Sequence, residues 1–153
     1  MSGTIEVDTM EIKFVKLSPT QNMTVLAEDI VPRERHREVA ERLMAYDGVF
    51  GEQVGFVEKP RNPAAWARLQ MMGGEFCGNA SMALAALLAW DRGLSAGQRV
   101  EALLEVSGAE DLLSVDVLLK DGAAACAVEM PLPESIEELT LSLDGQDCQV
   151  AVV

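Results

Sequence analysis

The 153-residue chain is long enough for one domain or one domain and the start of another, and its 49% hydrophobic residues suffice for a packed core. Its 25 acidic and 12 basic residues give a net charge of −13, which disfavours nucleic acid as a partner. No stretch is long enough to span a membrane, and the acidic N-terminus lacks the regions of a signal peptide, so we expect a cytoplasmic protein.

Hydrophobic spacing predicts the first elements in chain order. Strands at 11–17 and 23–27, joined by the turn residues "SPTQN", are expected to form a hairpin. An amphipathic helix is expected over 33–45, with His36 on its solvated face. Two further strands are predicted at 53–59 and 65–72.

A long apolar helix is predicted over 78–91, ending near Gly93. It is apolar all round, so we expect it to be buried on every side. A curved antiparallel sheet wrapped around this helix would bury it, which predicts an α+β fold. The remaining strands are predicted at 99–106, 112–120 and 123–130, followed by a hairpin around Asp144-Gly145.

The three cysteines, Cys77, Cys126 and Cys148, are odd in number and widely spaced. This arrangement fits neither a disulfide framework nor a zinc site, so we expect free thiols in a reducing compartment. Cys126 lies in an alternating strand and is expected in the core. Cys148 lies in a hairpin that looks polar, where we expect no role for it.

Cys77 precedes the apolar helix directly. Helix N-termini carry unpaired N–H groups and a partial positive charge, which favour a thiolate and can bind a carboxylate or phosphate. Gly78 would allow a ligand close to the backbone, and Asn79 could cap the helix or bind the ligand. The alternative is that Cys77 serves packing alone and that the preceding Gly73-Gly74 is only a tight turn.

The stretch "FCGNA" (76–80) resembles the first catalytic cysteine motif of the diaminopimelate epimerase and proline racemase superfamily. "IKFVKLSPTQNMTVL" (12–26) is similar to the opening hairpin of that family, and "GVFGEQVGFVE" and "VEMPLPE" follow in the family's order. "GGEFCGNA" looks closest to the histidine racemase branch, which serves bacterial metallophore synthesis. "LQMMGGEF" replaces the Asn-x-Asp-Gly-Ser stretch of the epimerases, which disfavours diaminopimelate as the substrate.

The resemblance implies racemisation or epimerisation of an amino acid without pyridoxal phosphate, another cofactor or a metal. Two cysteines would act on opposite faces of Cα, one removing a proton and the other delivering one. It implies that Cys77 is one of this catalytic pair, that Asn22, Gly78 and Asn79 bind the substrate, and that the substrate is histidine. It also implies a diaminopimelate epimerase-like fold, of which this would be one of two pseudo-repeated domains.

Members of the family have a second domain that supplies the second cysteine. We therefore expect residues 1–133 to form the N-terminal epimerase-like domain and residues 134–153 to form a linker and the first hairpin of a truncated or separate second domain. The expected partner is a complementary C-terminal domain or chain, and the isolated chain is expected to be inactive.

Two other functions remain open at this stage. A phenazine-biosynthesis-like isomerase would use a carboxylate, and Glu75 lies close to the motif, although Cys77 argues against it. A module that binds small carboxylates without turnover would keep only the helix N-terminus. A second polypeptide with another helix-opening cysteine would favour the racemase.

Overall fold

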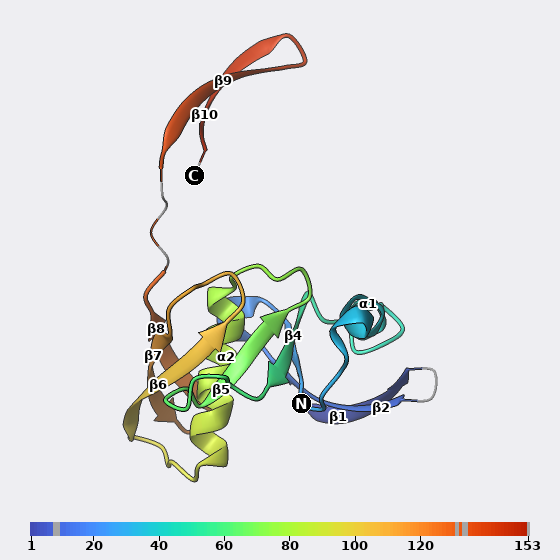
Figure 1. Ribbon diagram of the computed structural model, residues 1–153, viewed down its shortest axis with the longest axis vertical. Coiled ribbons are helices and arrows are strands. Elements are labelled where there is room, and N and C mark those ends of the chain that lie inside the picture. Colours follow the sequence, from blue (N-terminus) through green and yellow to red (C-terminus); the bar gives the residue numbers. More distant parts are fainter. Residues whose placement is uncertain (8–9, 131, 133–134, 153) are drawn as a thin grey trace.

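The computed structural model describes residues 1–7, 10–130, 132 and 135–152, which form ten strands, two α-helices and two short 3₁₀ helices (Figure 1). Eight strands build one sheet in the order in which they occur in the sequence, and the last two pair separately. The strands are β1 (Ser2–Val7), β2 (Met10–Leu17), β3 (Thr24–Ala27), β4 (Gln53–Glu58), β5 (Ala67–Met71), β6 (Arg99–Val106), β7 (Leu113–Lys120), β8 (Ala123–Val128), β9 (Glu137–Leu143) and β10 (Gln146–Val152).

The large sheet is mixed rather than wholly antiparallel as expected: most neighbouring strands are antiparallel, but two pairs are not. β3 pairs with β4, and β5 with β6, in parallel. Parallel neighbours need a long crossover connection, and each α-helix lies in one of these two connections. These crossovers contain α1 (His36–Met44), which follows the 3₁₀ helix η2 (Arg33–Arg35), and α2 (Gly78–Asp91).

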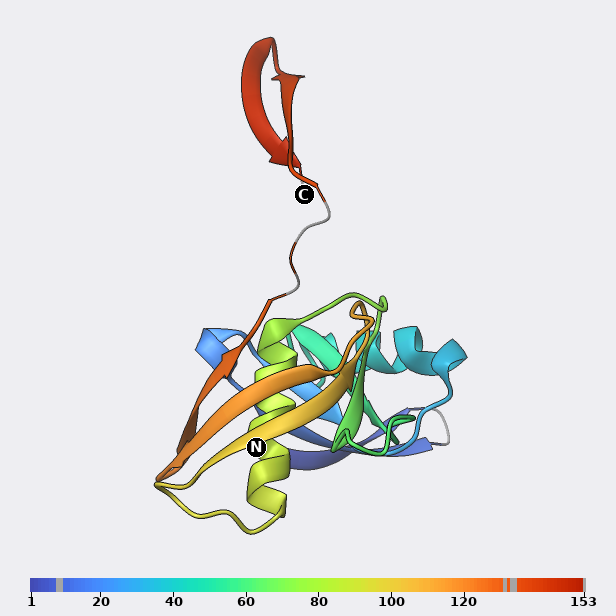
Figure 2. The ribbon, with the colours of Figure 1, turned by 60° about the vertical axis from the view of Figure 1, so that its left-hand side comes forward.

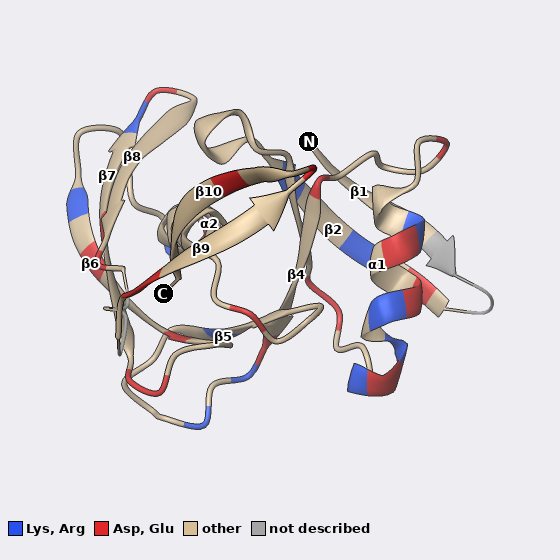
Figure 3. Cartoon of the chain, turned by 90° about the horizontal axis from the view of Figure 1, so that it is seen from above, with Lys and Arg blue, Asp and Glu red and all other residues tan. Residues whose placement is uncertain are grey.

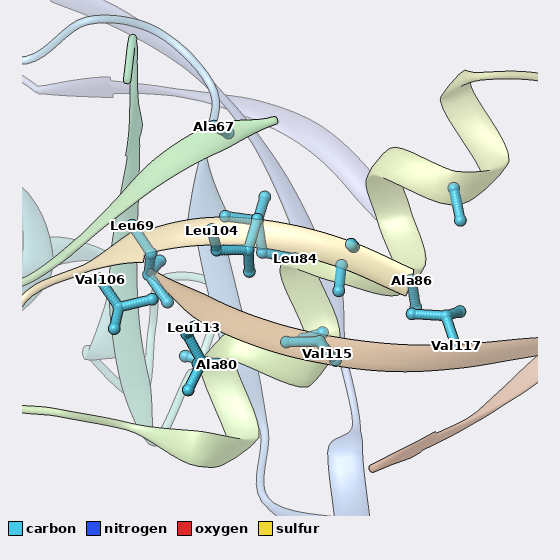
Figure 4. Close-up of a cluster of buried hydrophobic side chains, with 14 of the residues drawn as sticks. Ala67, Leu69, Ala80, Leu84, Ala86, Leu104, Val106, Leu113, Val115 and Val117 are labelled. Atoms are coloured by element: carbon cyan, nitrogen blue, oxygen red, sulfur yellow. The ribbon is translucent and has the colours of Figure 1, made fainter. Parts of the chain in front are cut away.

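Helix α2 has the bounds that the sequence predicts, and the sheet curves around it (Figure 2). Leu84, Ala85 and Ala89 are fully buried in a core shared with β5, β6 and β7. Figure 4 shows part of this core, with Leu84, Leu104 and Val115 among its labelled residues. The expectation that the helix is buried on every side is nevertheless wrong. A groove of about 520 Å³ runs between one flank of α2, at Met82 and Trp90, and residues 17–20 and 122–126. The sheet is open, with β1 and β8 as its two edge strands.

Charged residues crowd the outer surface of α1 (Figure 3), but His36 is not among the solvated groups. Only 3% of His36 is exposed, and its ring stacks on Phe56 with 3.7 Å between the ring centroids. Its Nε2 lies 3.0 Å from the carbonyl oxygen of Val31. The predicted solvated position is therefore wrong. His36 lies beside Val39 and Leu43 in a second buried cluster.

Strands β9 and β10 form a hairpin that stands away from the body of the molecule (Figures 1 and 2). Leu141 pairs with Cys148, and Leu139 with Val150, so these side chains share one face. Leu139 and Leu141 are 43% and 45% exposed. The hairpin is therefore amphipathic rather than polar, and Cys148 lies on its apolar face.

The predicted domain boundary between residues 133 and 134 falls outside the described residues. No helix in the described part of the chain is both long enough and apolar enough to cross a membrane.

Candidate active site

Cys77 is the N-cap residue of α2. Its backbone is extended (φ −139°, ψ 106°), and its Sγ accepts a hydrogen bond from the N–H of Ala80 at 3.4 Å. Ser81 Oγ donates to the carbonyl oxygen of Cys77 at 2.8 Å. The sulfur thus takes the place that an oxygen fills in an ordinary N-cap and satisfies one of the free N–H groups of the first turn.

The loop before Cys77 is fixed by a turn that lies 30 residues further along the chain. Ser107, which is buried, donates through Oγ to the carbonyl oxygen of Glu75 at 2.7 Å and accepts from the N–H of Met71 at 3.0 Å. Gly108 has φ +74°, and a Cβ there would lie 2.3 Å from the backbone nitrogen of Phe76. Ser107 and Gly108 therefore fix the position of the backbone at residues 75–76, which leads directly into Cys77 and α2.

A second contact to the sulfur comes from β4. Cys77 Sγ donates to Gln53 Oε1 at 3.1 Å, and Gln53 Nε2 donates to Thr24 Oγ1 at 2.6 Å. Thr24 is fully buried, and its hydroxyl donates to the carbonyl oxygen of Asn22 at 3.3 Å. The thiol is therefore connected to the parallel strands β3 and β4, which lie side by side at this point.

Asn79 belongs to a chain of side-chain hydrogen bonds that crosses from α2 to the 3₁₀ helix η1 (Pro19–Gln21). Its Oδ1 accepts from Thr20 Oγ1 at 3.1 Å, and its Nδ2 donates to Asn22 Oδ1 at 3.3 Å. Asn22 Nδ2 in turn donates to Glu52 Oε2 at 3.1 Å. Thr20 has φ 51° and ψ 36°, a conformation that is strained for a β-branched residue and that is often found at functional sites.

The predicted site residues Cys77, Gly78, Asn79 and Asn22 thus come together at the N-terminal end of α2. A Cβ on Gly78 would lie 3.1 Å from Met130 Sδ, so a larger residue would crowd the start of the helix. The first N–H groups of a helix have no partner within it and can bind an anion at this end.

The other sequence candidates lie elsewhere. Cys126 is on β8, where its Sγ donates to the carbonyl oxygen of Met82 at 3.7 Å and burial raises its pKa. Cys148 is on the separate hairpin, and Glu75 is exposed in the loop. Within the described part of the chain, no three His, Cys, Asp or Glu side chains gather closely enough to hold a metal ion.

Sequence analysis missed Gln53, Thr24, Thr20 and Ser107. Gln53 stood inside "GVFGEQVGFVE", which was compared only as a segment, and Thr20 stood inside the turn "SPTQN". The one signal for Thr20, Thr24 and Gln53 was their position near Asn22 or at the start of a strand, and Ser107 had no such signal. Their contacts reach across 24 to 59 residues of sequence, which spacing does not reveal.

The structure is thus a mixed α+β domain with a cysteine at the N-terminus of its central helix. A family model described as "Histidine racemase CntK N-terminal domain" matches residues 11–153, and the chain belongs to this family. Two histidine racemases of Fusobacterium nucleatum are 33% and 35% identical to it over 145 and 135 residues, which cover 92% and 85% of this chain. A histidine racemase of Staphylococcus aureus is 42% identical over 72 residues, 46% of this chain and 26% of that protein.

The chain spans about half the length of the Fusobacterium relatives, since the matches cover 50% and 47% of those proteins.

Proposed function

We propose that this chain is the N-terminal half of a cofactor-independent histidine racemase and that Cys77 is one of its two acid/base residues. The single observation that carries the proposal is the thiol of Cys77 at the N-terminus of α2, beside Asn22 and Asn79, in a chain of the racemase family. The curved sheet around α2 supports the corresponding proposal of a diaminopimelate epimerase-like domain.

Racemisation at Cα requires a proton to leave one face and another to arrive on the opposite face. A single base would return the proton to the face from which it came, so a second group must lie across the substrate. In one direction Cys77 delivers its proton to Cα while the partner removes the α-proton. In the reverse direction Cys77, as thiolate, removes the proton, and the partner delivers one.

The carbanion formed at Cα is stabilised when its charge spreads into the carboxylate of the substrate. Hydrogen-bond donors that are already oriented toward this carboxylate stabilise the transition state most. The first N–H groups of α2, at Gly78 and Asn79, are suited to this task, and the helix dipole adds a partial positive charge. In this scheme the Asn22 and Asn79 amides, which contact each other, flank the bound amino acid.

The second half of the enzyme would begin at the β9–β10 hairpin. Its apolar face carries the exposed Leu139 and Leu141 and the half-buried Val150, and it resembles a sheet surface that lacks the element packed on it. In this proposal residues 134–153 open a second domain, supplied by the remainder of the protein or by another chain, and that domain provides the second cysteine. The three free thiols fit a reducing compartment such as the cytoplasm.

Complementation with a relative tests the function. The chain is joined to the part of the F. nucleatum histidine racemase that lies beyond the matching region, and conversion of L-histidine to D-histidine is followed by circular dichroism. We expect turnover from the joined protein without added pyridoxal phosphate or metal, and none from either half alone. Turnover by this chain alone, or a requirement for pyridoxal phosphate, would overturn the proposal.

A further inference from the structure

The sulfur of Cys77 has two hydrogen-bond neighbours of opposite kind. The N–H of Ala80 can only donate, so that contact favours the thiolate. Gln53 Oε1 can only accept, so that contact requires the hydrogen of the thiol. Whether Cys77 rests as a thiol or as a thiolate therefore depends on which of the two hydrogen bonds is held more firmly.

The orientation of the Gln53 amide is fixed by Thr24. The hydroxyl of Thr24 has a single hydrogen, which it donates to the carbonyl oxygen of Asn22. Its Oγ1 therefore accepts from Gln53, which places Nε2 toward Thr24 at 2.6 Å and leaves Oε1 facing the sulfur at 3.1 Å. Because Thr24 is fully buried, water does not compete for its hydroxyl.

We infer that Gln53 is a positioning residue that holds Cys77 in its thiol form in the resting protein, with Thr24 fixing the amide that does so. This inference rests on the proposed function for its meaning in catalysis. A thiol at rest makes Cys77 the proton donor of the first turnover. The partner removes the α-proton and leaves the electron pair of that C–H bond at Cα, this pair takes up the S–H proton to form the new C–H bond, and the S–H electron pair stays on sulfur. The thiolate left behind keeps the hydrogen bond from Ala80.

The inference is tested by the rate at which iodoacetamide alkylates Cys77 in this chain, measured by peptide mass spectrometry from pH 6 to pH 10. Iodoacetamide reacts with the thiolate. In Gln53→Leu the acceptor is lost, and we expect alkylation at pH 7 to be about 5-fold faster, the effect of one hydrogen bond.

Two further variants test whether the alkylation rate of Cys77 changes in the expected direction. Gln53→Glu has the same size but places a negative charge beside the sulfur, so alkylation should be slower than in the unchanged protein. Thr24→Val leaves every atom that touches the sulfur in place but frees the amide to turn, so alkylation should be faster by a smaller factor than in Gln53→Leu. Gln149→Leu is the matched control, because Gln149 Nε2 also donates to a threonine, Thr140 Oγ1, at 2.9 Å on the distant hairpin.

Cys126 serves as the internal standard, and its alkylation rate should be the same in every variant. The inference is overturned if Gln53→Leu leaves the Cys77 rate unchanged or lowers it, or if the Leu and Glu variants shift it in the same direction. Should the Leu variant not fold, the isosteric Glu variant decides, since an unchanged or faster rate there also contradicts the inference. No racemase activity enters this measurement, so failure of the proposed function would not mimic either result.

Discussion

Asn79 Nδ2 donates to Asn22 Oδ1 at 3.3 Å, which joins the first turn of α2 to the segment between η1 and β3. The contact joins residues that are 57 positions apart in the sequence. If this amide pair holds the amino acid, Asn22→Ala in the joined racemase should raise KM for histidine about 10-fold or more, the effect of losing a hydrogen bond to a charged group. kcat should change less. Steady-state kinetics check this, with Asn62→Ala in a surface loop as the control.

An unchanged KM in Asn22→Ala would show that the amide pair serves only the folded structure.

Gly108 supports the loop that carries Cys77, and replacing it should lower the free energy of unfolding by an unusually large amount. Gly108→Ala places a Cβ 2.3 Å from the backbone nitrogen of Phe76, so the loop must shift. Gly122→Ala is the matched control, because Gly122 also has positive φ (+69°) but nothing lies within 4 Å of the added Cβ. The control should cost about 1 kcal/mol of unfolding free energy for its conformation alone. The Gly108 variant should cost at least ~1–3 kcal/mol more from overpacking.

Denaturant unfolding of the two variants measures this difference. Equal losses would mean that the 75–76 backbone yields freely and that Gly108 does not position the loop.

Burial lowers the pKa of His36 below its usual value, because the imidazolium is poorly solvated between α1 and Phe56. The folded state thus prefers the neutral ring, while the unfolded chain titrates near pH 6.5. The stability contributed by neutral His36 is complete above that pH and is lost as the pH falls below it toward the folded-state pKa. We expect the unfolding midpoint in urea to drop between pH 7.5 and pH 5.5.

In His36→Phe, which keeps an aromatic ring against Phe56, the same acidification should change the midpoint much less. An equal drop in both proteins would assign the effect to other groups.

The apolar face of the β9–β10 hairpin is predicted to pack against the rest of the second domain. In the two-part protein, Leu141→Lys should weaken the association of this chain with the separately supplied C-terminal half, since it buries a charge in the contact. Ser142→Lys puts the same charge on the opposite face of β9 and should have little effect. Analytical ultracentrifugation of the mixed halves measures both, and equal weakening by the two variants would count against this face as the contact.

Local patterns were sufficient for α2. Its N-terminus at Cys77, its uninterrupted apolar run and its stop at Gly93, which has φ +81°, are all encoded within 17 neighbouring residues. The parallel pairing of β3 with β4 could not be found in this way, because both strands also suit an antiparallel sheet. His36 was misplaced because its charged neighbours in "RERHRE" describe the outer face of α1, whereas the ring of His36 stacks on Phe56 of strand β4.

The site residues also divide into those that the local sequence predicts and those that only the fold brings together. Cys77, Gly78 and Asn79 are adjacent in the sequence and were identified from the chemistry of a helix N-terminus and the family motif. Gln53 is brought to the sulfur only by the crossover through α1 and the parallel register of β3 and β4, which place Thr24 opposite Gln53. A contact that depends on sheet order is not visible in residue spacing.

Exchange of the α-proton of histidine in D₂O tests the central claim most directly, because it reports proton removal at Cα. With this chain joined to the C-terminal half of the F. nucleatum racemase, ¹H NMR should show loss of the α-proton signal of histidine. Cys77→Ser should reduce the exchange rate by about 100-fold or more, since a serine hydroxyl is a far weaker acid than a thiol. Exchange at the full rate in Cys77→Ser would contradict the account.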